Sequence, residues 1–292
     1  MRLMVTGAGG FVGRALAARL SARHDLVLIL RPGSPAPALG RAVRTVAWDL
    51  EGAPPAGLPD HIDGVVHLAQ CRRYRAFPDS AGEMLNVNVA AAVHLADYAR
   101  RAGARHFCLA SSGSVYEPFD MPLTEGGALA PTTFNGASKL AAEQLLAPFR
   151  AYMPVFVPRL FFPYGPGQVD RLIPDLIGRV RAGRPIQLDA DGGGLALSPI
   201  FVTDVVDILE KAVENLWDGT VNVAGPEAVS LRGLGETIGE LLGRPALFEA
   251  VDRPPQRILP DLARLRALHP VASMVGVREG LRRTLAADGA PD

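Results

Sequence analysis

Short strand-like runs, rich in apolar residues, alternate with segments of helical spacing through the first half of the chain. Each run is five or six residues long, the length of a buried strand, and the runs cover residues 2–6, 25–30, 43–48, 64–69 and 105–110. Residues 81–102 place Leu85, Val89 and Val93 near one face and stop before Gly103, as a capped helix does. A second long helix is predicted over residues 135–152. This alternation predicts right-handed crossovers and a doubly wound parallel sheet of the α/β class.

Proline and glycine become frequent after the apolar run at residues 153–160. They crowd into residues 162–167, 183–185 and 192–194, where we expect the chain to leave the sheet and build a smaller lobe. Two further apolar runs flank a helical segment and could supply a late strand, residues 200–206 and 220–224. The predicted first domain is therefore residues 1–163 plus about 196–224, and the mostly C-terminal, substrate-binding lobe is about 164–195 plus 225–292.

A glycine-rich turn follows the first predicted strand and opens a helix. The segment 6–13 reads TGAGGFVG, with glycines at Gly7, Gly10 and Gly13. In that context the first glycine permits a tight turn, the second admits a pyrophosphate to the backbone, and the third allows close helix–strand packing. The helix N-terminus then offers free N–H groups to the phosphates. The turn predicts a Rossmann dinucleotide-binding domain.

The residues after the second strand favour NADP(H). An acidic residue at this point would bind the ribose 2′-OH of NAD, but the strand runs into Arg31 and Ser34, which suit a 2′-phosphate. Asp49 after the third strand is a candidate contact for the adenine edge, or only a turn former. The remaining residues predicted here to line the cofactor are Phe11 and Val12 in the glycine segment and Leu50 beside Asp49.

Composition narrows the class of partner. The 292 residues carry a formal net charge of +0, so no global field attracts nucleic acid or an anionic membrane, and the expected partner is a small molecule. No uninterrupted apolar stretch reaches the about 18 residues of a membrane span. The only cysteines are Cys71 and Cys108, which makes a disulfide framework improbable and predicts a cytoplasmic protein. No metal site is predicted.

Several further segments, in this order, carry a family resemblance. They are 66–69 (VHLA), 86–89 (NVNV), 111–116 (SSGSVY), 164–166 (YGP) and 201–205 (FVTDV). Together with the glycine turn they resemble the extended short-chain dehydrogenase/reductase family, the NAD-dependent epimerase/dehydratase group, over nearly the whole chain. The resemblance implies that Ser112 orients the substrate, that Asn88 supports the active-site backbone and that Tyr116 lies in the substrate region. It also implies that Leu68 and Ala69 line the cofactor.

The catalytic tyrosine of that family is missing. The family's Tyr-x-x-x-Lys pair falls on segment 135–139 (NGASK), where Asn135 replaces the tyrosine and Lys139 is retained. Lys139 is one of two lysines in a chain that otherwise uses arginine, which favours a functional role over a solvated one. The spacing places Asn135 and Lys139 on one helix face. By resemblance, Ser112, Asn135 and Lys139 form the candidate catalytic set, and Lys139 also holds the nicotinamide ribose.

Asn135 changes the expected chemistry. A carboxamide orients a carbonyl through hydrogen bonds but does not titrate near neutral pH, so it cannot supply the proton. The proton would come from water, from the substrate or from a nearby residue. Tyr74, Tyr116 and Tyr164 are candidate replacements, although Tyr116 and Tyr164 also have structural interpretations.

Two departures from the nucleotide-sugar enzymes of the family bear on the substrate. Phe162 stands where those enzymes have an asparagine, and Leu197 where they have an arginine, while Arg253 keeps a third position. This loss of polar contacts favours an apolar pocket around Phe162 and therefore a hydrophobic or aromatic ketone.

Three hypotheses follow. The first is an NADPH-dependent reductase of a polyketide-like ketone. The second is a nucleotide-sugar epimerase, dehydratase or ketoreductase, and the third is a catalytically inert dinucleotide-binding sensor or scaffold. The two long predicted helices also allow a homodimer, as the family resemblance implies.

Overall fold

The computed structural model describes residues 1–39 and 43–288, and these residues form two compact units. The first unit contains residues 1–118, 128–160 and 205–221. The second unit contains residues 119–127, 161–204 and 222–292 as far as they are described. The predicted bounds placed residues 196–204 in the first domain, whereas these residues belong to the second unit. The segment 119–127 joins the second unit, a detail that the sequence did not predict.

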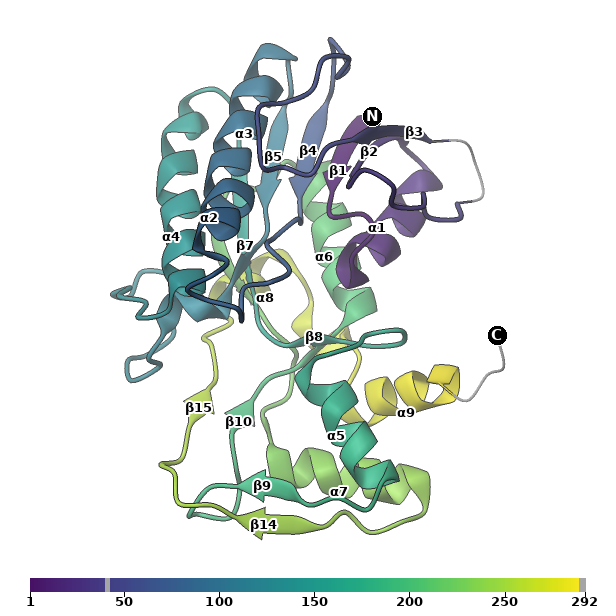
Figure 1. Cartoon of the computed structure of the whole chain (residues 1–292), viewed down its shortest axis with the longest axis vertical. Helices are drawn as coiled ribbons and strands as arrows, with labels where there is room; N and C mark the ends of the chain where they lie inside the picture. The colour runs from purple at the N-terminus through teal and green to yellow at the C-terminus, as the bar shows by residue number, and fades with distance from the viewer. Residues whose placement is uncertain (40–42, 289–292) are drawn as a thin grey trace. The chain divides into compact units, whose positions relative to one another are not determined.

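The first unit is built on a mostly parallel sheet with the order β12-β7-β5-β4-β1-β2-β3, and β6 lies beside β7 (Figure 1). The pairs β1–β2, β1–β4 and β4–β5 are parallel, and their registers align Leu3 with Leu26 and with Gly64. This sheet confirms the predicted Rossmann-like α/β class. Its strands are β1 (Arg2–Thr6), β2 (Asp25–Leu30), β3 (Arg44–Ala47), β4 (Gly64–His67), β5 (His106–Leu109), β6 (Ser111–Ser112), β7 (Val155–Leu160) and β12 (Gly219–Val223).

Helices cover both faces of this sheet, with α3 and α4 on one face and α1 and α6 on the other (Figure 1). Strands buried on two faces need continuous apolar runs, which is why β2 is buried at every position after Asp25. The helical elements of the first unit are α1 (Phe11–Ser21), α2 (Ala81–Met84), the π-helix η1 (Leu85–Ala90), α3 (Ala91–Arg101), the 3₁₀ turns η2 (Gly113–Tyr116) and η3 (Ala147–Ala151), α4 (Phe134–Leu146) and most of α6 (Val202–Glu214).

The second unit packs short strands and helices around its own apolar core. Leu176, Leu188, Leu197 and Leu234 are among the buried members of this core. Its strands are β8 (Pro163–Tyr164), β9 (Ile186–Leu188), β10 (Ala196–Leu197), β11 (Ile200–Phe201), β13 (Val229–Ser230), β14 (Phe248–Ala250) and β15 (Arg257–Ile258). Its helices are α5 (Leu172–Arg181), α7 (Leu231–Leu242), α8 (Ala263–Leu268), the 3₁₀ turn η4 (Val271–Ser273) and α9 (Val277–Asp288).

Three predicted elements differ from the structure. The helix over 81–102 is interrupted by η1, and the helix over 135–152 becomes a 3₁₀ turn at Ala147, next to Pro148. The late strand expected from the runs 200–206 and 220–224 is β12 of the second run, whereas the first run forms only β11 before α6 begins at Val202. This difference has a simple cause, since a short apolar run has no period that separates a strand from a buried helix turn.

Candidate active site

The glycine turn is too tightly packed for side chains at two of its positions. Gly7 has a φ of +70°, and a Cβ there would lie 2.8 Å from the Ala69 backbone nitrogen. A Cβ on Gly13 would lie 2.0 Å from the carbonyl oxygen of Gly7. A Cβ on Gly9 would meet nothing within 4 Å. The geometry therefore requires glycine at Gly7 and Gly13 but not at Gly9.

Helix α1 begins at this turn without a side-chain cap. Gly10 is the N-cap residue, and no side chain accepts a hydrogen bond from the first turn of the helix. No acidic residue lies in that turn either. Uncapped N–H groups at a helix N-terminus suit a phosphate, and the absence of a Cβ on Gly10 leaves the approach open. These residues fit the pyrophosphate of a dinucleotide, with Phe11 and Val12 half-buried in the first turn.

The residues directly after β2 include the positively charged Arg31 and no acidic residue. Arg31 and Ser34 are both exposed, and the Ser34 N–H donates to the Arg31 carbonyl at 3.0 Å in a turn. Asp49 accepts a hydrogen bond from the Glu51 N–H at 3.0 Å, so it also serves as a turn former. Leu50 is buried with a φ of 69°.

Strand β4 ends beside the glycine turn. The Ala69 N–H donates to Thr6 Oγ1 at 3.2 Å, and Thr6 Oγ1 also lies 2.7 Å from His67 Nδ1. Leu68 and Ala69 are half-buried directly after the strand. Burial, assisted by the Lys139 charge, lowers the pKa of His67 to about 3, so His67 is neutral near pH 7 and is no source of a proton.

Ser112 is held as a hydrogen-bond acceptor from the backbone. It is the N-cap of η2, and its Oγ accepts from the Ser114 N–H at 3.1 Å. A hydroxyl that accepts from an N–H still has its own hydrogen to donate. Ser112 is half-buried, so this hydrogen is available to the oxygen of a substrate.

Asn135 approaches the same turn from helix α4. Its Nδ2 donates to Ser114 Oγ at 3.4 Å, a long hydrogen bond, and Asn135 is half-buried. A Cβ on Gly136 would lie 2.5 Å from the Ser114 carbonyl oxygen, so a glycine here allows the helix to pack against the turn. The structure thus brings Ser112, Ser114 and Asn135 together, and Ser114 is a member that the sequence analysis missed.

Lys139 lies one turn further along α4 and is buried. Its Nζ donates to the Ala110 carbonyl oxygen at 3.1 Å, at the end of β5. Burial lowers the pKa of Lys139 to about 8, while the carboxylate of Glu143 opposes that shift. A buried ammonium with these neighbours is a fixed positive charge near neutral pH.

Asn88 connects the loop after β4 to helix α4. Its Oδ1 accepts from the Cys71 N–H at 2.8 Å, and its Nδ2 donates to Ser138 Oγ at 2.9 Å. Ser138 in turn donates to the Asn135 carbonyl oxygen at 2.8 Å. Asn88 belongs to the π-helix η1, an irregularity that is common at functional sites. The contacts agree with the supporting role that the resemblance implied for Asn88.

None of the three tyrosines proposed as replacements stands free at this cluster. The Tyr116 hydroxyl accepts from Arg159 Nη1 at 2.7 Å, and Tyr116 is buried. Tyr164 lies in the second unit, donates to the Val277 carbonyl at 3.3 Å and has its pKa raised by burial. Tyr74 is half-buried against the apolar core of the first unit, with Arg75 over its ring. The direct substrate contact predicted for Tyr116 therefore has no support in its geometry.

Phe162 and Leu197 belong to the packing of the second unit. Leu197 is fully buried in the core of that unit, and Phe162 packs against the same core with a φ of 46°. Arg253 donates to the Gln187 carbonyl at 3.0 Å. Core packing therefore accounts for the apolar side chains at both positions, and an apolar substrate pocket is no longer needed to explain them.

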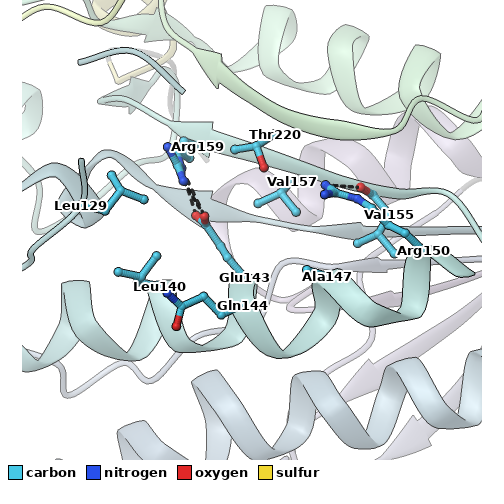
Figure 2. Close-up of a pocket in the computed structure, with 10 residues that line it drawn as sticks. All are labelled: Leu129, Leu140, Glu143, Gln144, Ala147, Arg150, Val155, Val157, Arg159 and Thr220. Carbon is cyan, nitrogen blue, oxygen red and sulfur yellow. Dashed lines mark hydrogen bonds and ion pairs between the residues drawn. The ribbon is translucent and has the colours of Figure 1, made fainter. Parts of the chain in front are cut away.

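A buried ion pair behind the site was also missed. Arg159 on β7 donates to Glu143 on α4, with Nη2 and Oε2 2.7 Å apart, and both side chains are less than a tenth exposed. They border a cavity of about 210 Å³ whose walls come from α4, η3, β7 and β12 (Figure 2). A signal was present in the sequence, because Arg159 is the one charged residue in an otherwise apolar strand.

The sequence of residues 3–224 matches the family described as "NAD dependent epimerase/dehydratase family". The match covers well over half of the chain, so the chain belongs to this family. This confirms the resemblance drawn from the sequence segments.

Named relatives act on nucleotide sugars. The chain is 30% identical to "dTDP-4-dehydro-6-deoxy-D-allose reductase" of Streptomyces bikiniensis, over 90% of this chain and 89% of the relative. It is 26% identical to "UDP-glucuronic acid decarboxylase 1" of Arabidopsis thaliana, over 97% of this chain and 68% of the relative. Among solved structures, "MoeE5 in complex with UDP-glucose and NAD" has a TM-score of 0.83 at 27% identity and covers 99% of this chain and 98% of that one.

Within residues 1–39 and 43–288, no helix is both long and apolar enough to cross a membrane. The same residues contain no group of three or more His, Cys, Asp or Glu placed to hold a metal ion. Cys71 and Cys108 are both buried and unpaired with one another.

Proposed function

We propose that this chain is a nicotinamide dinucleotide-dependent oxidoreductase that reduces a keto group on a nucleotide-linked sugar. Family membership and the names of the relatives support a nucleotide-sugar substrate over the polyketide-like ketone that the sequence analysis favoured. The main argument for that ketone was the apolar character of Phe162 and Leu197, which packing explains. The relative with 30% identity is named as a reductase, which supports the direction of reaction.

The observation that carries the proposal is the character of the groups beside Lys139. Ser112 has a hydrogen to donate and Asn135 offers a carboxamide, but neither of them removes a proton near neutral pH. Oxidation of an alcohol needs a base for the hydroxyl proton. Reduction of a carbonyl needs only a donor, because the alkoxide that forms takes a proton from water. The reverse path would need hydroxide as its base, which is scarce near pH 7, so we assign reduction as the direction of the proposed reaction.

In the proposed reaction, the glycine turn and Lys139 would hold a reduced dinucleotide, which would supply the hydride of the new C–H bond and become oxidised. Ser112 donates a hydrogen bond to the carbonyl oxygen as it gains charge, and Asn135 orients the carbonyl. The positive charge of Lys139 stabilises the negative charge that develops on this oxygen. Lys139 also holds the nicotinamide ribose. Water then gives the alkoxide its proton and leaves hydroxide. Electrostatic preorganisation of this kind carries much of the rate enhancement in many enzymes.

The cofactor is NADP(H) in preference to NAD(H) in this proposal. Arg31 at the end of β2 supplies a guanidinium for a 2′-phosphate, and the nearest acid further along the chain, Asp49, already accepts from Glu51. The solved relative MoeE5 was studied with NAD, so the preference is a point on which this chain would differ. A homodimer and a cytoplasmic location stay predictions.

The proposal can be tested directly by measuring the decrease in NADPH absorbance. The protein is mixed with a panel of nucleotide-linked keto sugars and, in parallel, with aromatic ketones. We expect oxidation of NADPH with at least one keto sugar and none with the aromatic ketones. The reverse pattern would restore the polyketide hypothesis. Dinucleotide binding without turnover of any substrate would support the inert sensor instead.

A further inference from the structure

The carboxylate of Glu143 links the elements that carry the candidate catalytic residues, helix α4 and strand β6, to strand β7. Glu143 follows Lys139 by four residues, so both side chains emerge from the same face of helix α4. The Glu143 carboxylate accepts from Arg159 of β7 through Nε at 3.1 Å and through Nη2 at 2.7 Å. It also accepts a short hydrogen bond from the hydroxyl of Ser111 on β6. Three elements therefore meet at this one side chain.

Ser111 connects this carboxylate to the reacting region. Ser111 and Ser112 are adjacent in β6, so their side chains point to opposite faces of the strand. Ser111 is bound to Glu143 on one face, which leaves Ser112 directed to the other. Arg159 extends the network to η2, because its Nη1 donates to the Tyr116 hydroxyl and its guanidinium lies 4.9 Å from the centre of the Tyr116 ring.

The charges of this network act on Lys139. Two titratable groups reach Lys139 electrostatically, Glu143 on the same helix and His67 from β4, and the Ala110 carbonyl accepts its hydrogen bond. His67 is buried and neutral, so it contributes no charge. Glu143 is therefore the acid that offsets the buried ammonium, and Arg159 in turn fixes Glu143 from the cavity side (Figure 2).

We propose that Glu143 is a positioning residue of the active site, whose carboxylate, anchored by Arg159 and Ser111, compensates the charge of Lys139 and fixes α4 against β6. The inference rests on the proposed role of Lys139 in holding the dinucleotide. In this proposal Glu143 contacts neither cofactor nor substrate, but its charge influences the protonation of Lys139, which does contact the cofactor.

The chain offers a clean measurement of this coupling. Lys139 and Lys211 are the only lysines, so protein labelled with ¹³C at lysine Cε gives two resonances, and Lys211→Arg assigns them. Lys211 pairs with Asp207 on α6 at 2.9 Å and serves as the internal reference. The pH titration of the Lys139 signal needs neither cofactor nor substrate.

The test variant is Glu143→Met with Arg159→Met, because removing both charges avoids an unpaired buried arginine. We expect the Lys139 midpoint, near pH 8 in the native chain, to fall by about one pH unit, a tenfold loss of proton affinity. Glu143→Gln with Arg159 retained should shift it in the same direction and replaces the double variant if that one does not fold. Arg150→Met, which borders the same cavity and contacts Asp218 instead, is the matched control and should leave the midpoint unchanged.

A second readout is the affinity for NADPH across the same pH range. The pH at which binding weakens should fall together with the Lys139 midpoint, while Glu143→Asp, which keeps the charge, should recover most of the native profile. An unchanged midpoint in a folded Glu143 variant would overturn the inference. Failure of the native chain to bind either dinucleotide would instead overturn the proposed function, because the lysine titration does not depend on it.

Discussion

The glycine turn and the cluster of Ser112, Asn135 and Lys139 both lie at the carboxyl edge of the first unit's sheet, but they are built differently. The turn is made of backbone, and a Cβ on Gly13 would come within 2.0 Å of a carbonyl oxygen. The cluster is made of side chains from β6 and α4, and Asn135 Nδ2 reaches Ser114 Oγ of the neighbouring turn η2 only at 3.4 Å. A backbone site tolerates almost no change, whereas a side-chain site can accept a different residue at position 135 and keep its framework.

The largest expected effect breaks the backbone site. Gly13→Ala forces the turn apart, so we expect the Kd for NADPH to rise by about 1,000-fold, equivalent to ~4 kcal/mol. Gly9→Ala is the matched control, because its Cβ would meet nothing within 4 Å. A fluorescence titration of both variants measures the difference. Equal affinities would show that the pyrophosphate does not lie on this turn.

The next largest effect is expected from a change in the side-chain cluster that leaves the glycine turn intact. Ser112→Ala removes the donor to the developing oxyanion, and we expect kcat to fall by about 100-fold with little change in the Kd for NADPH. Ser112→Thr retains the hydroxyl and serves as the control. A loss of cofactor affinity equal to the loss in turnover would contradict the separation between the two sites.

The burial of Lys139 can be tested through the pH dependence of the free energy of unfolding. The pKa of this lysine is about 8 when folded against 10.5 as its ordinary value, so between these pH values only the unfolded chain binds the proton. The free energy of unfolding of the native chain therefore gains up to about 3 kcal/mol as pH rises through that window, a gain that Lys139→Met lacks. Urea unfolding of both proteins on either side of the window measures the difference. Parallel pH profiles would contradict the burial of a charged lysine.

The smallest expected effect concerns the choice of cofactor. Arg31 is exposed, so its contact with a 2′-phosphate is partly screened by solvent. We expect Arg31→Gln to weaken NADPH binding by about tenfold, or ~1.4 kcal/mol, and to leave NADH binding unchanged. Ser34→Ala should give a smaller change in the same direction. An equal loss for both dinucleotides would place Arg31 elsewhere on the cofactor.

The sequence was sufficient for features that depend on local pattern. Strands β1 and β2 were predicted at their observed bounds, because each contains an uninterrupted group of apolar residues, 3–5 in β1 and 26–30 in β2. The glycine turn was predicted because its residues are contiguous. In the apolar run 200–206 only two residues form a strand, since a short apolar run does not distinguish a strand from the helix that begins at Val202.

Features that depend on contacts between distant segments were less accessible. Ser114 joins the site through a contact with Asn135, 21 residues further along, and Glu143 meets Arg159 across 16 residues. The argument from Leu197 to an apolar substrate had a related weakness, because an apolar residue has the same identity in a pocket wall and in a core. Burial, which a single sequence does not report, separates the two.

On helix α4, one residue packs the helix against the turn and its neighbour faces the reaction site. Gly136 does the packing, through its close approach to the Ser114 carbonyl. The helix is seated by a residue that has no side chain, so its neighbour at position 135 is free to vary without lifting the helix from the sheet. A lineage could therefore exchange a titrating phenol for an amide in one step while the fold remained intact. Libraries that seek new activities in this scaffold should randomise position 135 and leave position 136 alone.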